Sequence, residues 1–156
     1  MSPDKPSSRS ANRVSLEGYR PKRLFTVEQA NAVLPLARAI VSDLAQLSRD
    51  VIERRERLGC LAAGRPVAAR DLYSEEVAQI EQELEKDTDR LKEYIDELRA
   101  LGVEPKNGPE GLIDFPALID GRLVFLCWKL GETEVLHWHD LDAGFAGRHC
   151  LVADSV

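Results

Sequence analysis

The chain of 156 residues is short of the residue types that most often carry chemistry: it has three cysteines, three histidines and two tryptophans. The cysteines form no CxxC pair, and because their number is odd they fit a reducing compartment better than a disulfide framework. No run of about eighteen apolar residues occurs, and no apolar segment follows the basic residues near the N-terminus. These absences predict a cytoplasmic protein that neither spans a membrane nor is secreted.

Several motif classes are missing as well. The sequence contains no glycine-rich phosphate loop, no dinucleotide-binding fingerprint and no serine nucleophile motif. Its net charge is −6. Residues 1–23 carry six basic and two acidic side chains, a net of +4, which leaves −10 for the remaining chain. Because an acidic body repels phosphate backbones, nucleic acid is a disfavoured partner.

Length and composition predict one domain preceded by a tail. Residues 1–22 contain prolines, serines and basic residues but no clustered apolar residues, so we expect a flexible basic arm. Residues 23–156 are long enough to bury a core without disulfides. Hydrophobic residues make up 44% and charged residues 31% of the chain, as in globular proteins rich in charged helices.

A first helix is predicted to begin at Val27. Thr26 is placed to cap it, Gln29 completes a capping box, and Phe25 can pack on Ala30 as a hydrophobic staple. Apolar residues then recur at alternating spacings of three and four, as in a coiled-coil seam. They are Val33, Ala37, Ile40, Leu44, Leu47, Val51 and Leu58.

This helix should continue past Pro35 with a local bend and end near Leu58, where Gly59 can adopt the left-handed conformation of a helix end. A second helix is predicted to have Ser74 as its cap and to end at Gly102. Its seam comprises Val77, Ile80, Leu84, Asp87, Leu91, Tyr94, Leu98 and Leu101. The two helices predict an antiparallel hairpin over residues 26–102.

Charged residues support this antiparallel pairing. Arg54, Arg55 and Arg57 lie near the end of the first helix, and Glu75 and Glu76 lie near the start of the second. Opposite charges therefore meet near the loop. Because each exposed pair contributes only about 0 to 1 kcal/mol, these charges set the register more than they stabilise the hairpin.

After the second helix the hydrophobic period changes from 3.6 to 2, which indicates strands. Asp120–Gly121 predicts a type I′ hairpin turn, and Pro116 places the first strand at a sheet edge because it lacks an N–H donor. The predicted strands are Ile113–Ile119, Leu123–Leu130 and Val135–Leu141. The sequence thus predicts an α+β fold: a long, coiled-coil-like antiparallel helical hairpin followed by a small three-stranded antiparallel β-meander over residues 111–150.

Alternation along regular strands would place two apolar faces on this sheet. One face would comprise Ile113, Phe115, Ala117, Val124, Leu126, Trp128, Val135, His137, His139 and Leu141. The other would comprise Leu123, Phe125, Cys127, Leu136 and Trp138. The hairpin can cover one face and a second copy of the chain the other, so we expect a homo-oligomer, most simply a dimer.

All three histidines and both tryptophans lie between Cys127 and Cys150. His137 and His139 would lie on one strand face about 7 Å apart, a spacing that lets two imidazoles bind one ion. A third ligand would come from Glu132, Asp142, His149 or Cys127. A transition metal such as zinc is one interpretation, and histidines hydrogen-bonded for structural reasons are the other.

Two further features have structural and functional interpretations. The segment 144–148, Gly-Phe-Ala-Gly-Arg, is either an anion-binding backbone nest or a turn whose arginine, Arg148, pairs with Asp142 or Asp114. Cys127 fits a buried small hydrophobe better than a nucleophile, because nothing in the sequence places a base or a cation beside it.

Several segments together carry a family resemblance: Phe25–Asn31 with Leu34–Pro35, Gly111–Pro116, Leu126–Trp128 with Gly131–Glu132, and Trp138–His139 with residues 144–148. Over about residues 24–149 they resemble an uncharacterised family of small bacterial proteins classed as a domain of unknown function. The resemblance implies the same fold and a bacterial cytoplasmic origin, and it assigns no activity.

The resemblance also points to site residues. Those that match its motifs, and would cluster near the sheet as a ligand site, are Asp114, Trp128, Glu132, Trp138, His139 and Arg148. The position of His137 departs from the family pattern, where it is aromatic or variable, and this weakens a two-histidine metal site. The sequence therefore favours a non-enzymatic, self-associating interaction or scaffold protein. The alternative is a metal- or small-ligand-binding protein, or an enzyme, with a site around His139.

Overall fold

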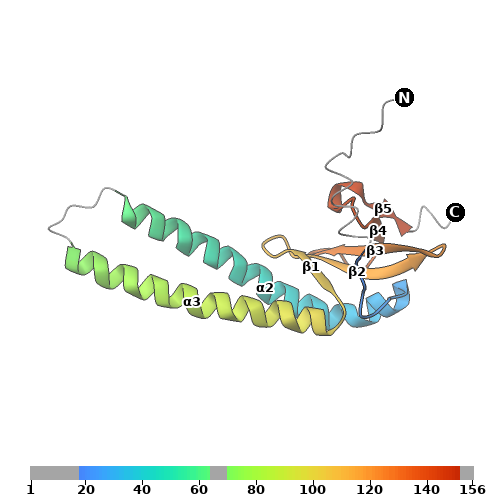
Figure 1. Cartoon of the computed structure of the whole chain (residues 1–156), viewed down its shortest axis with the longest axis horizontal. Helices are drawn as coiled ribbons and strands as arrows, with labels where there is room; N and C mark the ends of the chain where they lie inside the picture. The colour runs from blue at the N-terminus through green and yellow to red at the C-terminus, as the bar shows by residue number, and fades with distance from the viewer. Residues whose placement is uncertain (1–17, 64–69, 152–156) are drawn as a thin grey trace, which may run out of the picture.

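Two long helices and an antiparallel sheet make up the computed structural model, which describes residues 18–63 and 70–151. The sheet packs on one end of the helical hairpin, and the other end extends beyond it (Figure 1). The elements are α2 (Val27–Ala62), α3 (Arg70–Ala100), β1 (Glu104–Asn107), β2 (Leu112–Ile119), β3 (Arg122–Lys129), β4 (His137–Asp140), the 3-10 helix η2 (Phe145–Gly147) and β5 (His149–Cys150). The α+β class is confirmed.

The start of α2 follows its sequence signals. Thr26 Oγ1 accepts a hydrogen bond from the Gln29 N–H at 3.1 Å, and Gln29 Oε1 accepts one from the Thr26 N–H at 3.0 Å. Phe25 and Ala30 are both buried in the core, as the staple predicted. The Phe25 N–H also donates to the Pro116 carbonyl at 2.7 Å, so the beginning of the helix is tied directly to β2.

The helix ends near the connecting loop differ from the sequence prediction. Gly59 lies inside α2, which continues to Ala62, and Ser74 lies inside α3, which begins at Arg70. A glycine inside a helix costs about 1 kcal/mol and a cap residue contributes about as much. Burial of Leu61, one turn beyond the predicted end, favours the longer helix. Local signals of this size therefore did not set the boundaries.

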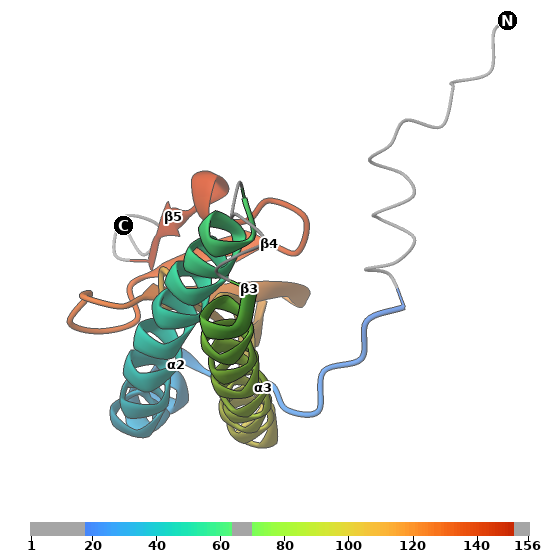
Figure 2. The same cartoon turned by 90° about the vertical axis from the view of Figure 1, so that its left-hand side faces the viewer.

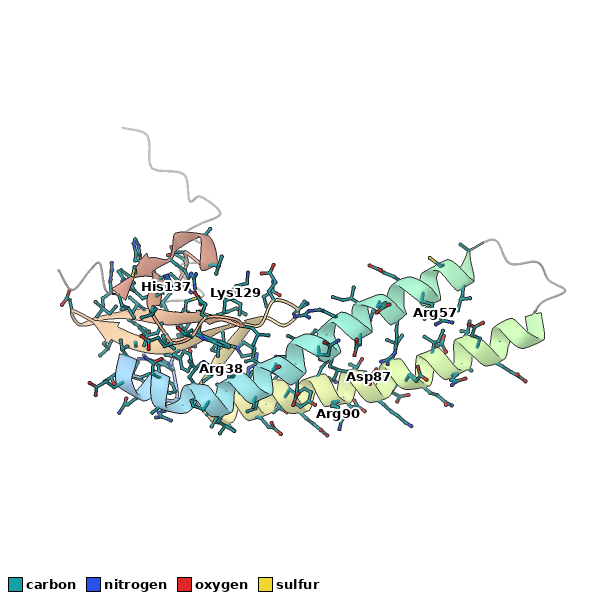
Figure 3. All side chains as sticks on the ribbon, turned by 180° about the vertical axis from the view of Figure 1, so that it is seen from behind. Arg38, Arg57, Asp87, Arg90, Lys129 and His137 are labelled. Carbon is teal, nitrogen blue, oxygen red and sulfur yellow. The ribbon has the colours of Figure 1, made fainter. Side chains whose placement is uncertain are left out.

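The hairpin joins the polar positions of the two seams. Arg54, the polar residue between Val51 and Leu58 in the first seam, pairs with Asp87, the polar member of the second. Arg57 Nη2 lies 3.2 Å from Glu76 Oε1, as the charge pattern predicted. Figure 2 looks along the hairpin from its loop end, with α2 and α3 side by side, and Figure 3 places Arg57 and Asp87 on the part that extends beyond the sheet.

The sheet has five strands rather than the predicted three, in the order β1-β2-β3-β4-β5, and every pair is antiparallel. The two strands that were missed, β1 and β5, have only four and two residues, too few for a period-2 pattern to show. Asp120 and Gly121 have φ values of 52° and 77°, so both turn positions are left-handed as a type I′ turn requires.

Pro116 was predicted to mark a sheet edge, and β2 is an interior strand. Its partner β1 pairs only as far as Asp114, and at Pro116 the carbonyl accepts the Phe25 N–H in place of a bond from an outer strand. The missing donor is tolerated because the outer strand stops two residues earlier.

The third predicted strand is shorter than Val135–Leu141, and its faces are reversed. Pairing of Cys127 with His137 and of Phe125 with His139 puts both histidines on the Cys127 face. The cause lies before the strand: the Val135 N–H donates to Asn31 Oδ1 of α2 at 2.7 Å, and regular pairing starts only at His137. A shift of one residue exchanges the two faces of a strand.

The sheet therefore has two different faces. Residues of the face against the helices form the core with α2 and α3: Ile113, Phe115, Ala117, Val124, Leu126 and Trp128. On the outer face Asp114, Phe125, Cys127 and His139 are also buried. Tyr19 covers part of this face, with its ring centroid 5.7 Å from that of Phe125. Neither described helix combines the length and hydropathy needed to cross a membrane.

A candidate metal centre on the outer face of the sheet

Three potential ligands from three adjacent strands meet on the outer face. Asp114 of β2 lies directly opposite Cys127 of β3, and His139 of β4 lies opposite Phe125, one same-face position along β3. Their exposed fractions are 1%, 0% and 2%. One ligand atom from each residue lies within 4.8 Å of the other two. The strand register alone thus brings an oxygen, a sulfur and a nitrogen donor to one buried point.

The orientation of His139 is fixed through both ring nitrogens. Nδ1 lies 2.7 Å from the backbone oxygen of Asp140, which can only accept, so Nδ1 carries a proton and donates it. Nε2 lies 3.0 Å from each carboxylate oxygen of Asp114. The imidazole therefore directs Nε2 at the cluster.

The charges around His139 compete. Burial lowers its pKa, but the hydrogen bond and the charge of Asp114, together with the carbonyl of Asp140, raise it more, and the net pKa lies above the ordinary value. Lys106 opposes this rise through its positive charge. The imidazolium form, paired with the Asp114 carboxylate, is thus stabilised in the folded protein.

Asp114 and Arg148 both lie near Cys127 and change its pKa in opposite directions. Burial, followed by the negative charge of Asp114, raises its pKa to about 12, although Arg148 acts in the opposite direction. A thiol with this pKa is protonated at neutral pH and is a poor nucleophile. The expectation that Cys127 is buried is confirmed.

A second polar cluster adjoins the first through Arg148. Its Nη1 lies 2.9 and 3.0 Å from the two carboxylate oxygens of Glu132, which also accepts the Lys129 N–H at 2.7 Å. Burial raises the pKa of Glu132, but these hydrogen bonds and the charges of Arg148 and His137 lower it by more, so the net pKa lies below the usual value. His137 Nδ1 lies 3.5 Å from Glu132 Oε2 and, among the described residues, makes no hydrogen bond.

The two histidines share a face, as the sequence predicted, but they contact different carboxylates. His139 faces Asp114, whereas His137 faces Glu132 (Figure 3 labels His137 beside Lys129). The candidate group of ligands that the geometry assembles contains His139 and not His137.

The two tryptophans of the predicted ligand site, Trp128 and Trp138, lie on the opposite, helix-facing side of the sheet from these clusters. Trp128 is fully buried in the core between sheet and helices, and its Nε1–H donates to the Glu132 carbonyl at 3.0 Å. Trp138 packs against the core and lies 4.5 Å from the ring of His149. Among the residues singled out by the family resemblance, Asp114, His139, Glu132 and Arg148 form the polar network, and the tryptophans support it.

The segment after β4 forms one wall of a cavity above the cluster. Gly144, with φ of 69°, leads into η2, and the Gly147 N–H donates to the Gly144 carbonyl at 3.1 Å, so this segment is a closed turn. Arg148 pairs with Glu132 rather than with the predicted Asp142 or Asp114. The cavity has a volume of about 240 Å³, and its lining includes Lys106, Leu112, Asp114, His139, Leu141 and Phe145.

Strand alternation in the sequence placed Cys127 and His139 on opposite faces of the sheet, so Cys127, although named as a possible third ligand, was not expected beside His139. A signal was present, because Asp114 is a lone carboxylate in the otherwise apolar segment Leu112–Ile119, and a buried acid requires a partner. The partner could not be chosen from the sequence, because the face of β4 depends on the irregular connection that precedes it.

Fold and site define an α+β protein in which a helical hairpin carries a five-stranded sheet with a buried Asp–Cys–His cluster. The model of the family described as an uncharacterized conserved protein, DUF2203, matches residues 23–151, and the chain belongs to this family. The family resemblance found in the sequence is confirmed. No curated protein and no solved structure matches the chain.

Proposed function

We propose that this protein binds a transition-metal ion, with Asp114, Cys127 and His139 as its ligands. The convergence of three different donor atoms at one buried point carries the proposal. Thiolate, imidazole and carboxylate are the ligands that zinc uses in proteins. His137, the second histidine of the two-histidine site suggested by the sequence, is not among these ligands.

The geometry fits an ion of this size. Neighbouring ligand atoms in a tetrahedral zinc site lie roughly 3.3 to 3.8 Å apart, as bond lengths of about 2.0 to 2.3 Å require. The three candidate atoms lie within 4.8 Å of one another, with His139 Nε2 3.0 Å from Asp114, so movements of about 1 Å would complete the site.

The surroundings of His139 also match those of a metal ligand. Ligating histidines almost always donate their second ring N–H to a carbonyl or carboxylate, which fixes the ring and its tautomer. The Asp140 carbonyl accepts the Nδ1–H of His139 in this way. Three protein ligands leave a fourth position for water or a small molecule, the arrangement of catalytic rather than structural zinc sites.

Because Cys127 must remain a free thiol to act as a ligand, the proposal suits a reducing, cytoplasmic setting. All three cysteines are free in the structure, and Cys60 and Cys150 are exposed. These two cysteines supply matched controls for Cys127.

The test is metal analysis of untagged protein that has been stripped with a chelator, loaded with Zn²⁺ or Co²⁺ and dialysed. We expect one ion per chain, and for Co²⁺ the charge-transfer absorption of a cobalt–thiolate bond. Cys127→Ser should abolish that absorption, whereas Cys150→Ser and His137→Ala should leave it unchanged. Wild-type protein without stoichiometric metal, or a Cys127→Ser protein with the same absorption, would contradict the proposal.

One observation supports the second candidate, a self-associating scaffold role. The far end of the hairpin has no sheet against it (Figure 1). Ile52, in the second half of α2, is 45% exposed. Long helices with spare apolar surface often pair with a second copy. Sedimentation equilibrium at micromolar concentration tests this role: a concentration-independent monomer would exclude it, and an Ile52→Glu variant should weaken any dimer.

A further inference from the structure

We infer that the cavity above Asp114 and His139 binds a small organic anion, whose charged group completes the coordination of the metal ion. This inference rests on the metal site proposed above. It assigns a ligand class to the open coordination position.

The cavity has the size and lining of a small-molecule site. The cavity of about 240 Å³ includes Asp114 and His139 in its lining, so two of the three proposed ligands face its interior. At roughly 30 Å³ per water molecule it has room for on the order of eight waters, or one small organic molecule. Its other walls include the apolar side chains of Leu112, Leu141 and Phe145, which suit the body of such a molecule.

Lys106 places a positive charge in the lining of this cavity. It is the residue at which the β1–β2 register shifts, and bulges of this kind re-aim a side chain next to a site. Its Nζ lies 4.6 Å from the ring centroid of Phe125, and its side chain lines the same cavity as His139. None of the ion pairs among the described residues includes Lys106.

The charges around the proposed ion favour an anion at its open position. A divalent ion bound by the Asp114 carboxylate and the Cys127 thiolate is neutral as a group, so the Lys106 ammonium adds one positive charge beside the open position. The opposing group in the cavity lining is the exposed carboxylate of Asp142. The two residues should therefore affect an anion in opposite directions.

The experiment uses Co²⁺-loaded full-length protein titrated with benzoate, followed by the visible absorption of the cobalt ion. Benzamide has the same shape without the charge and serves as the ligand control. We expect benzoate, and not benzamide, to change the spectrum with saturation. Lys106→Gln should weaken benzoate binding about threefold to tenfold, as for a partly exposed charge, and Asp142→Asn should strengthen it. Lys92→Gln, an exposed lysine on α3, is the matched control and should leave binding unchanged.

The outcomes separate the two proposals. Failure to bind cobalt through a thiolate would remove the metal site, and this inference with it. Cobalt binding with no response to benzoate, an equal response to benzamide, or no effect of Lys106→Gln would overturn the anion site alone. Inorganic phosphate, which carries charge without an apolar body, should bind more weakly than benzoate, and tighter binding of phosphate would overturn the organic class.

Discussion

The buried pair of Asp114 and His139 should be energetically coupled in the metal-free protein, and a double-mutant cycle measures that coupling. Removing one partner leaves the other charge or polar group buried without compensation. Since both side chains are at most 3% exposed, Asp114→Ala or His139→Ala alone should lower the free energy of unfolding by about 3 to 5 kcal/mol. The double variant should lose well under the sum of the two, because it leaves neither group uncompensated.

The coupling should depend on pH with a definite sign. The folded pKa of His139 is raised above its unfolded value. The ion pair therefore stabilises fully below the unfolded pKa of about 6.5 and loses that contribution as the pH rises through the folded pKa. At high pH the Nε2 lone pair faces a carboxylate, because Nδ1 keeps its proton for the Asp140 carbonyl.

Urea denaturation with chelator present, at pH 6 and again at pH 9, tests this reasoning. The exposed pair Arg57 and Glu76, whose side chains are 68% and 42% exposed, is the control and should show a coupling of about 0 to 1 kcal/mol. We expect the coupling of the buried pair to exceed that of the control at pH 6 and to fall at pH 9. Additivity within about 0.5 kcal/mol at pH 6 would refute the account of this pair.

Four further predictions follow from the packing and the charges. Leu44→Ala, at a position 3% exposed, should lower the free energy of unfolding by about 2 to 5 kcal/mol. The control Arg49→Ala, at an exposed position, should lower it by well under about 1 kcal/mol. Equal losses in urea denaturation would mean that the seam of α2 is misplaced. The folded pKa of Glu132 is lowered, so its contribution to the free energy of unfolding is present above about pH 4.5 and is lost as the pH falls through the folded pKa. The stability of Glu132→Gln should therefore fall less steeply with decreasing pH than that of wild type. Tyr19→Ala should lower the melting temperature, because it uncovers Phe125, and an unchanged temperature would show that this contact contributes nothing. Calorimetric zinc affinity should rise with pH, since binding must displace the thiol proton, and a pH-independent affinity would exclude the thiolate as a ligand.

Much of the helical architecture could be predicted from the sequence because its signals are local. The capping box at Thr26 and Gln29, the turn at Asp120 and Gly121, and the meeting of Arg57 with Glu76 all depend on a few neighbouring residues or on a regular repeat. The outer strands β1 and β5 could not be predicted, because four and two residues carry no readable period.

The candidate site could be predicted from the sequence only in part, for a related reason. Asp114, His139, Glu132 and Arg148 were identified through the family resemblance, and their proximity depends on strand register. The meeting of His139 with Cys127 could not be predicted, since it depends on which residues of β4 lie on the Cys127 face. Which residues lie there is set by a hydrogen bond between Val135 and Asn31, which are far apart in the sequence.

X-ray absorption at the zinc edge of the loaded protein tests the metal site most directly, because it identifies the atoms bound to the ion. The account predicts one sulfur at about 2.3 Å with nitrogen and oxygen ligands at about 2.0 to 2.2 Å, and loss of the sulfur in Cys127→Ser. A zinc ion without sulfur in its coordination shell, or a sulfur that persists in Cys127→Ser, would contradict it.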